Sequence, residues 1–479
     1  MEIHWIDLAI FTIYLFAMLG IGFFFYRKNE SKEDYYVGKR EMSAGHIGLS
    51  VVATDVGGGF SIGLGGLGFM MGISGSWMLF TGILGAWLSA VFLIPKVYKH
   101  GKKHNFLSFP QLLEFYYDKR PAFIAGVISF IGYVGFTSSQ VLAGAKLASA
   151  TFPAFSLTEA VLIIGTIAIV YTVAGGLKAV VYTDTVQWII LMSGLILVGV
   201  PFGYYHLGGW EGIARHMPAG FFSLGNISWV QIINWTVTIV PIWFIGMTLY
   251  QRIYACRDEK TAKKAWLIAG LFEWPVMAFL GTLLGLFGRV ALEQGLLAGV
   301  GYTSVADIDS EIALPVFLRQ ILPIGFMGLI MSAYFSAIMS TADSCLMAAS
   351  GNLMTDIIRP FHRKFGDSIR ASQLLTLLIG GIAIFIALQM GQVLEIMLYS
   401  YAFMVSGIFV PVLMLLINRK HSALAAILSM IFGGATTLIL VVSGLELPLG
   451  LDAIIFGIAA SLLVFWITAL FDRRAKTSP

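Results

Sequence analysis

Apolar residues in this chain come in long blocks that are separated by short polar segments. Most blocks are close to the ~20 residues that an α-helix needs to cross a bilayer core of roughly 30 Å. The pattern predicts an all-α polytopic membrane protein, a single transmembrane domain over residues 1–479 with about thirteen spanning helices. We place these helices at about 5–26, 46–72, 74–95, 121–150, 158–174, 181–204, 229–250, 265–288, 322–354, 371–390, 392–417, 422–442 and 451–471.

The predicted helices fall into four groups along the chain. The helix at 5–26 stands apart, and two helices over 422–471 close the chain. The loop at 205–228 divides the ten central helices into a first set over 46–204 and a second set over 229–417. Because each set holds an odd number of helices, the second set enters the membrane from the opposite side. We therefore expect a 5+5 inverted repeat, with a binding site near the middle of the membrane where helices are broken.

Composition and charge agree with a membrane protein. Of 479 residues, 58% are hydrophobic and 12% are charged, against about 25% charged in soluble domains. Of the 30 Lys and Arg residues, 26 fall on one side of the predicted membrane. The positive-inside rule then places the C-terminus in the cytoplasm and the N-terminus outside. We expect a multi-pass protein of the inner or plasma membrane, in contact with lipid, monomeric and without a nucleic-acid partner.

Ionisable side chains inside predicted spans are the first candidates for function, because they are costly in a bilayer. Lys146 lies near the outer end of its span, where it can attract a substrate carboxylate or extend to the headgroups. Glu273, before Trp274 and Pro275, either lines a pocket or satisfies backbone groups that the proline frees. The ionisable residues in or at the end of spans are Asp55, Lys146, Asp184, Glu273, Asp343 and Glu395.

Three consecutive glycines, Gly57, Gly58 and Gly59, follow Asp55 within a predicted span. Each costs a helix about 1 kcal/mol relative to alanine. An unwound stretch at membrane depth is tolerated only where it is buried in protein or lines a cavity. A broken helix offers free carbonyls to a cation and free amides to an anion. Gly59 and Gly63 also have the spacing of closely packed helices, but the nearby carboxylate favours a break.

A second group of polar residues lies in the predicted span 322–354. Ala337, Ser340, Thr341 and Ser344 have the spacing of one helical face. Sodium, as a hard cation, prefers oxygen ligands. Hydroxyls and a carbonyl from this helix, with two carbonyls from a broken helix, would supply five oxygens. Serine and threonine in membranes also bond to their own or a neighbouring backbone, so the spacing leaves both interpretations open.

Two segments resemble the signature of the sodium:solute symporter family. One is residues 175–187, with the pairs Gly175-Gly176 and Thr183-Asp184 and a final Gln187. The other is residues 340–356, which begins Ser-Thr-Ala-Asp-Ser. The resemblance covers nearly the whole chain. It implies a LeuT-like core and a secondary active transporter that takes up a small organic solute by alternating access, with Na⁺ as the coupling ion.

The resemblance also implies where sodium binds. Some members carry a second sodium ion nearer the cytoplasm, at positions that match Asp184, Ser340, Asp343 and Ser344. Those members have hydroxyls where this chain has Asp343, which leaves the number of coupled ions open. The main site matches the carbonyls of Ala53, Val56 and Ala337 and the hydroxyls of Ser340 and Thr341.

The solute is less well defined by the sequence. Asp55 matches an aspartate of the proline-transporting branch, whereas residues 56–59 resemble a choline transporter. We expect an amino acid, an osmolyte, a carboxylate or a similar molecule. The residues that we expect at the solute or coupling site are Asp55, Gly57, Gly58, Gly59, Phe60, Ser61, Gln140, Trp243, Gly246 and Tyr399.

Other classes of protein remain to be weighed against a sodium symporter. A proton-coupled symporter or a uniporter of the same fold would also explain buried carboxylates, as would a choline-like cation transporter. An enzyme is not expected, because the chain shows no metal triad, nucleophile elbow or phosphate loop in a soluble context. The segment 63–68 matches GxGxxG, but that motif is meaningful only after a strand in a βαβ unit.

Overall fold

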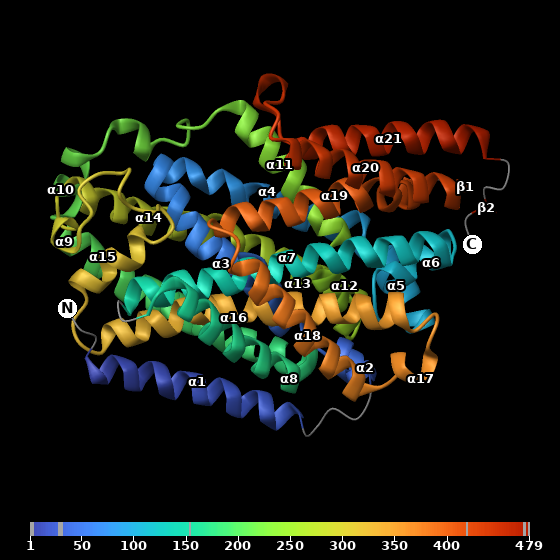
Figure 1. Ribbon diagram of the computed structural model, residues 1–479, viewed down its shortest axis with the longest axis horizontal. Helices are drawn as coiled ribbons and strands as arrows, with labels where there is room; N and C mark the ends of the chain where they lie inside the picture. The colour runs from blue at the N-terminus through green and yellow to red at the C-terminus, as the bar shows by residue number, and fades with distance from the viewer. Residues whose placement is uncertain (1–3, 27–31, 153–154, 418–419, 473–475, 478–479) are drawn as a thin grey trace.

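The computed structural model describes residues 4–26, 32–152, 155–417, 420–472 and 476–477. Long helices run side by side along one direction and form a single bundle (Figure 1). Within the described residues, the extended structure is one antiparallel pair of two-residue strands, β1 (Lys420–His421) and β2 (Lys476–Thr477). The predicted all-α class is confirmed.

The helices follow the predicted apolar blocks closely. In the first half they are α1 (Trp5–Tyr26), α2 (Lys32–Val37), α3 (Ala44–Met71), α4 (Trp77–Phe92), α5 (Ile94–His104), α6 (Pro110–Tyr116), α7 (Lys119–Thr151), α8 (Leu157–Gly194), α9 (Val200–His206) and α10 (Gly209–His216). In the second half they are α11 (Trp229–Ile245), α12 (Met247–Ala255), α13 (Glu259–Leu271), α14 (Ala278–Glu293), α15 (Ala313–Ile321), α16 (Phe326–Asn352), α17 (Arg363–Gly366), α18 (Ile369–Ala387), α19 (Val393–Ile417), α20 (Ala423–Ser443) and α21 (Ala453–Phe471). Short 3-10 or π turns are η1 (Gly38–Arg40), η2 (Gly72–Ser76), η3 (Leu195–Gly199), η4 (Ala219–Phe222), η5 (Phe272–Met277), η6 (Ala298–Val300), η7 (Leu353–Ile358) and η8 (Pro448–Gly450).

Fewer described helices are long enough to cross a membrane than the thirteen spans predicted from the sequence. Nine helices in the described ranges are long and apolar enough to cross a membrane, or ten if α11 and α12, which are bent by 41°, form one span. Shorter apolar helices cover Trp5–Ile21, Ala44–Thr54 and Leu157–Val170. Non-helical backbone interrupts α3 at Gly57 and α8 at Gly176. Thirteen spans and the inverted repeat stay predictions.

Helix α16 forms the centre of the bundle. In its most apolar stretch, 94% of the residues are buried, compared with 22% in α21. It packs against α3, α7 and α8, whereas α20 and α21 pack on each other and on α19 at the edge. Helix α1 begins and α21 ends at opposite ends of the bundle, and α5, α6 and α17 gather at the end where α21 finishes (Figure 1). The polar residues of α16 therefore lie away from lipid.

Candidate functional site

The break in α3 at Gly57 lies directly against α16. Gly57 has φ 14° and ψ −169°, so the helical ladder is interrupted there. A β-carbon on Gly58 would stand 2.5 Å from Ile338 Cγ1 and 2.8 Å from Ala143 Cβ. The amide of Gly58 donates to Gln140 Oε1 of α7 at 2.8 Å. Glycine thus allows α3 to unwind between α7 and α16, and Gln140 satisfies an amide that the break frees.

The hydroxyl of Thr341 lies where several backbone carbonyls converge. Its Oγ1 is 2.9 Å from the carbonyl of Thr54, 3.2 Å from that of Ala53 and 3.3 Å from that of Ala337. A hydroxyl donates a single hydrogen, so the carbonyls outnumber the donor. The structure therefore brings together three of the five predicted ligands of the main sodium site. All three residues are buried.

The remaining residues of the predicted main site and solute site are only partly described. Ser340 is fully buried on α16, and its hydroxyl forms no hydrogen bond with the described residues. Gly59 belongs to α3, and its surroundings lie outside the described part of the structure. The side chains that lie outside the described part of α3 are those of Asp55, Val56, Phe60 and Ser61.

A buried arginine occupies the region predicted for a second sodium ion. Arg252 and Asp184 are both 0% exposed, and Arg252 Nη2 lies 3.1 Å from Asp184 Oδ2. The same Nη2 donates to Thr54 Oγ1 at 2.6 Å and to Ser344 Oγ at 2.7 Å. Ser50 Oγ donates to Asp184 Oδ2 and accepts from Arg252 Nε. Two of the predicted ligands, Asp184 and Ser344, are thus bound by a guanidinium.

Asp343 belongs to a different contact. Its Oδ1 accepts a hydrogen bond of 2.5 Å from Thr172 Oγ1 on α8. Consecutive residues of a helix point about 100° apart, so Asp343 and Ser344 face different neighbours. The structure does not bring Asp343 to Asp184 by any contact among the described residues.

Arg252 is a buried charged residue of this region that the sequence did not predict. The predicted span ended at 250, which placed Arg252 in a basic cytoplasmic loop. This placement was wrong, because α12 continues to Ala255 and every residue from Met247 onward in it is buried. One signal was available. Arg252 lies two residues after an aromatic residue, Tyr250, and two before another, Tyr254, in a stretch that follows the helix breaker Gly246.

A second break separates α11 from α12 at Gly246. Its φ of −63° and ψ of 116° are extended, and the helices on either side are bent by 41°. Tyr133 of α7 supports this break, because its hydroxyl accepts from the Thr248 amide at 3.3 Å. Trp243, by contrast, packs against Gly85 of α4 and lies edge-on to Trp266 of α13. The described contacts of Trp243 are thus with α4 and α13.

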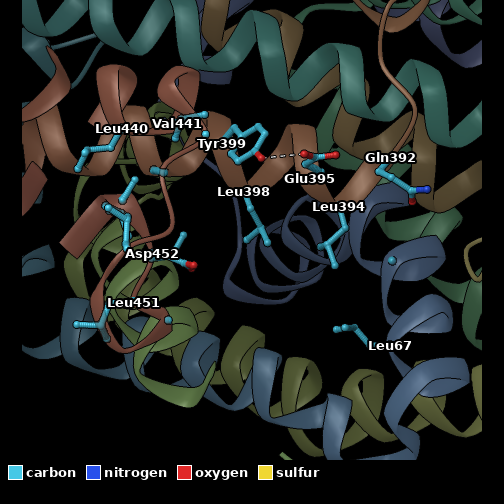
Figure 2. A pocket seen from close by; sticks show the side chains of 18 of the residues that line it. Leu67, Gln392, Leu394, Glu395, Leu398, Tyr399, Leu440, Val441, Leu451 and Asp452 are labelled. Carbon is cyan, nitrogen blue, oxygen red and sulfur yellow. Dashed lines mark hydrogen bonds between the residues drawn. The ribbon is translucent and has the colours of Figure 1, made fainter. Parts of the chain in front are cut away.

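A pocket of about 650 Å³ lies beside the C-terminal half of α3 (Figure 2). This volume is in the range of small-molecule sites. Residues of α3, α11 and α19 line it, together with the segment before α15 and the turn between α20 and α21. Tyr399 belongs to this pocket, where its hydroxyl donates to Glu395 at 2.8 Å (Figure 2). Glu311 and Asp452 also line it, and none of its described lining residues is a lysine or arginine.

Lys146 does not extend to the headgroups, because it is paired with carboxylates inside the bundle. It is 3% exposed, and its Nζ lies 2.5 Å from Asp309 Oδ2 and 2.6 Å from Glu311 Oε2. Glu311 also accepts from the amides of Val393 and Leu394, at the start of α19. Lys146 therefore joins α7 to the segment before α15 and to α19.

Glu273 lies against α4. It is fully buried, and one of its carboxylate oxygens would stand 2.1 Å from a β-carbon on Gly82 of α4. It lies in the π turn η5, which contains Pro275. Glu273 is not among the residues that line the pocket beside α3.

Comparisons with known proteins agree with this geometry. The family model of the sodium:solute symporter family matches residues 35–433. The chain is 27% identical to the osmoregulated proline transporter OpuE of Bacillus subtilis, over 97% of this chain and 95% of that protein. It is 27% identical to the high-affinity proline transporter PutP of the same organism, over 96% and 97%. It is 25% identical to a sodium/glucose cotransporter of Vibrio parahaemolyticus, over 98% and 91%.

Solved structures share the fold. A Na⁺-coupled sialic acid symporter in a substrate-bound outward-open state superposes with a TM-score of 0.81 at 20% identity, over 98% of this chain and 99% of that one. Mhp1, a nucleobase-cation-symport-1 family transporter in a closed conformation, superposes with a TM-score of 0.58 at 16% identity, over 92% and 96%. The recognised family and its function in sodium-coupled solute uptake are confirmed, and the chain belongs to the sodium:solute symporter family.

Proposed function

We propose that this chain couples the uptake of a small zwitterionic solute, an amino acid or a betaine-type osmolyte, to sodium bound at the Gly57 break. The observation that carries the proposal is the convergence of the Ala53 and Ala337 carbonyls on the Thr341 hydroxyl. Neutral oxygens held by a rigid backbone suit a monovalent hard cation. Ser340 and the carbonyl of Val56 complete the proposed ligand set.

The solute class follows from the charge of the pocket beside α3. Glu395 and Asp452 line it beside Glu311, which is paired with Lys146, so an uncompensated anion would be repelled on entry. A zwitterion carries an ammonium group that this surface attracts. The proline transporters among the relatives support the same class. A simple carboxylate is disfavoured on this ground.

The orientation and location follow from charge and helix placement. We place the N-terminus outside and the C-terminus in the cytoplasm of a cell membrane, because basic residues collect in the segments around α5, α6 and α17. In this orientation the pocket beside α3 opens toward the outside. We expect the transporting unit to be a monomer.

Thermal stability of the purified protein tests the proposal. A ligand that binds only the folded state stabilises it by RT ln(1 + [L]/Kd), so a panel of amino acids, betaines, monocarboxylates and sugars reports affinity directly. Each compound is measured in sodium and again in potassium buffer. A shift for zwitterions in sodium alone is the expected result. An equal shift in both buffers would identify a proton-coupled transporter or a uniporter and would remove the sodium site.

A further inference from the structure

A second pocket, of about 1000 Å³, lies at the end of the bundle where α5, α6 and α17 gather (Figure 1). It is enclosed by α6, the first turns of α7 and the segment 355–363, which runs from η7 into α17. None of the described residues that line it belongs to the sodium or solute sites proposed above. Its lining therefore serves something other than the transported solute.

The lining of this pocket is mainly basic. Of its thirteen described lining residues, four are lysine or arginine and two are glutamate or aspartate. One of the two carboxylates, that of Asp356, already accepts a hydrogen bond of 2.5 Å from Ser108 Oγ. The four basic residues are Lys119, Arg120, Arg359 and Arg363. Such a surface favours an anion, and arginine in particular binds phosphate through paired N–H donors.

The basic groups are available to an incoming anion. Arg120 Nη2 lies 2.9 Å from Asp118 Oδ2, and Arg359 Nε lies 2.9 Å from Asp367 Oδ1. Both pairs are exposed to solvent, and exposed pairs contribute little stability, so a phosphate can compete for these guanidinium groups. Lys119 and Arg363 line the same pocket and form no ion pair with any residue that the structure describes.

Aromatic side chains lie beside the basic ones. Phe123 and Phe361 both line the pocket, and their rings meet edge-on with centroids 6.0 Å apart. Phe361 is 70% exposed and Phe365, four residues later, is 45% exposed. Basic residues next to exposed phenylalanines are typical of segments that lie at a membrane surface. A free inorganic anion would use only the basic groups, whereas an amphiphile would use both kinds of side chain.

We propose that this pocket binds the phosphate headgroup of an anionic phospholipid such as phosphatidylglycerol. Lys119 and Arg120 contact the phosphate from the start of α7, and Arg359 and Arg363 contact it from the segment after α16. Phe361 contacts the acyl chains. The orientation proposed above places this lipid in the cytoplasmic leaflet, where anionic lipids and basic pockets between spanning helices attract each other. A bound headgroup joins α7 to η7, which continues α16.

Thermal stability of the purified full-length protein in detergent micelles tests this inference. Phosphatidylglycerol is titrated in potassium buffer without solute, and phosphatidylcholine, inorganic phosphate and glycerophosphoglycerol, which is the same headgroup without acyl chains, are titrated in parallel. Phosphatidylglycerol alone is expected to raise the melting temperature, because a ligand that binds the folded state stabilises it.

A double variant locates the lipid on the protein. Each basic residue beside an anionic headgroup contributes about fivefold in affinity. Lys119→Gln with Arg363→Gln should therefore raise the phosphatidylglycerol concentration for half-maximal stabilisation by about 25-fold. Lys260→Gln with Lys264→Gln is the matched control, because it removes the same charge from exposed positions on α13 outside the pocket. The control should respond to phosphatidylglycerol as the wild-type protein does.

Several results would overturn the inference. Equal stabilisation by phosphatidylcholine would show that the headgroup charge is not recognised. Equal stabilisation by inorganic phosphate or glycerophosphoglycerol would identify a soluble anion in place of a lipid. These results need no variant to fold. An unchanged lipid response in a folded Lys119→Gln, Arg363→Gln variant would place the lipid elsewhere. The titrations contain neither sodium nor solute, so their outcome leaves the proposed sodium site and solute class untouched.

Discussion

The hydroxyl of Thr341 lies so close to the backbone of Gly57 that a β-carbon on Gly57 would stand 2.0 Å from Thr341 Oγ1. Real β-carbons essentially never approach another heavy atom within 3.0 Å. The same approach brings the carbonyl of Ala53 to 3.2 Å from that hydroxyl. The unwound backbone of α3 and the polar face of α16 therefore form one unit. A substitution in either helix should change the packing of the other.

Replacement of Gly57 by alanine should disrupt this unit. The new methyl group would overlap Thr341, so α3 and α16 would have to separate, and we expect a lower melting temperature and a weaker response to sodium. Gly381→Ala on α18 is the control, because nothing lies within 4 Å of its β-carbon position. That variant should be neutral or more stable by up to about 1 kcal/mol. Equal melting temperatures for both variants would contradict the close packing of Gly57 on Thr341.

Removal of both hydroxyls in Ser340→Ala with Thr341→Ala should weaken sodium binding. We expect the sodium concentration for half-maximal stabilisation or uptake to rise by about tenfold or more, equivalent to about 1.4 kcal/mol. Ser336→Ala is the matched control on the same helix, since its hydroxyl bonds to the Ser332 carbonyl and to Tyr14. Unchanged sodium dependence in the double variant would show that sodium binds elsewhere.

Gln140→Leu should destabilise the break in α3. The substitution removes the acceptor of the Gly58 amide, and an unsatisfied buried donor costs about 1–3 kcal/mol. Chemical denaturation or the melting temperature measures the loss. Ser138→Ala, two residues away on α7, removes a hydroxyl that only bonds back to the Val134 carbonyl and should have a smaller effect. A Gln140→Leu variant as stable as Ser138→Ala would mean that another group satisfies Gly58.

Lys146→Met should destabilise the end of the bundle at which α1 begins. The substitution leaves Asp309 and Glu311 without their buried partner, and breaking a buried pair costs about 3–5 kcal/mol. Lys263→Met is the matched control. Its pair with Glu259 is 39% exposed on each side, and exposed pairs of this spacing contribute only about 0.3–0.5 kcal/mol. Adding Glu311→Gln to Lys146→Met should restore part of the stability, and a double variant no better than Lys146→Met would argue against the ion pair.

Much of the site was predictable because the sequence marks where a helix cannot continue. Three consecutive glycines predicted the break at Gly57, and the spacing of Thr341 and Ser344 predicted a polar helical face. The family resemblance indicated which backbone carbonyls bind sodium at the main site. Every residue has a carbonyl, so the sequence alone does not distinguish a ligand from any other. Gln140 was also named, although its bond to the Gly58 amide depends on how α7 packs against α3.

The parts that were not predictable depend on the direction in which a side chain points. Asp343 and Ser344 are neighbours in the sequence, yet one bonds to Thr172 and the other to Arg252. Trp243 lies near a helix break as expected but turns toward Trp266. Arg252 was missed because the predicted span ends at 250, five residues before the end of α12, so that a buried residue was placed in a loop. Only tertiary packing decides between these alternatives.

A sodium ion bound at the site proposed beside Gly57 also determines how far the solute can be concentrated. One sodium ion that moves through 100 mV yields about 2.3 kcal/mol, and a tenfold sodium gradient adds about 1.4 kcal/mol. Together they sustain a solute ratio of roughly 400-fold across the membrane, whereas a second ion would square that ratio. Each sodium ion coupled at this break therefore multiplies the steepest attainable solute gradient, and the cell must pump each one out again for every molecule taken up.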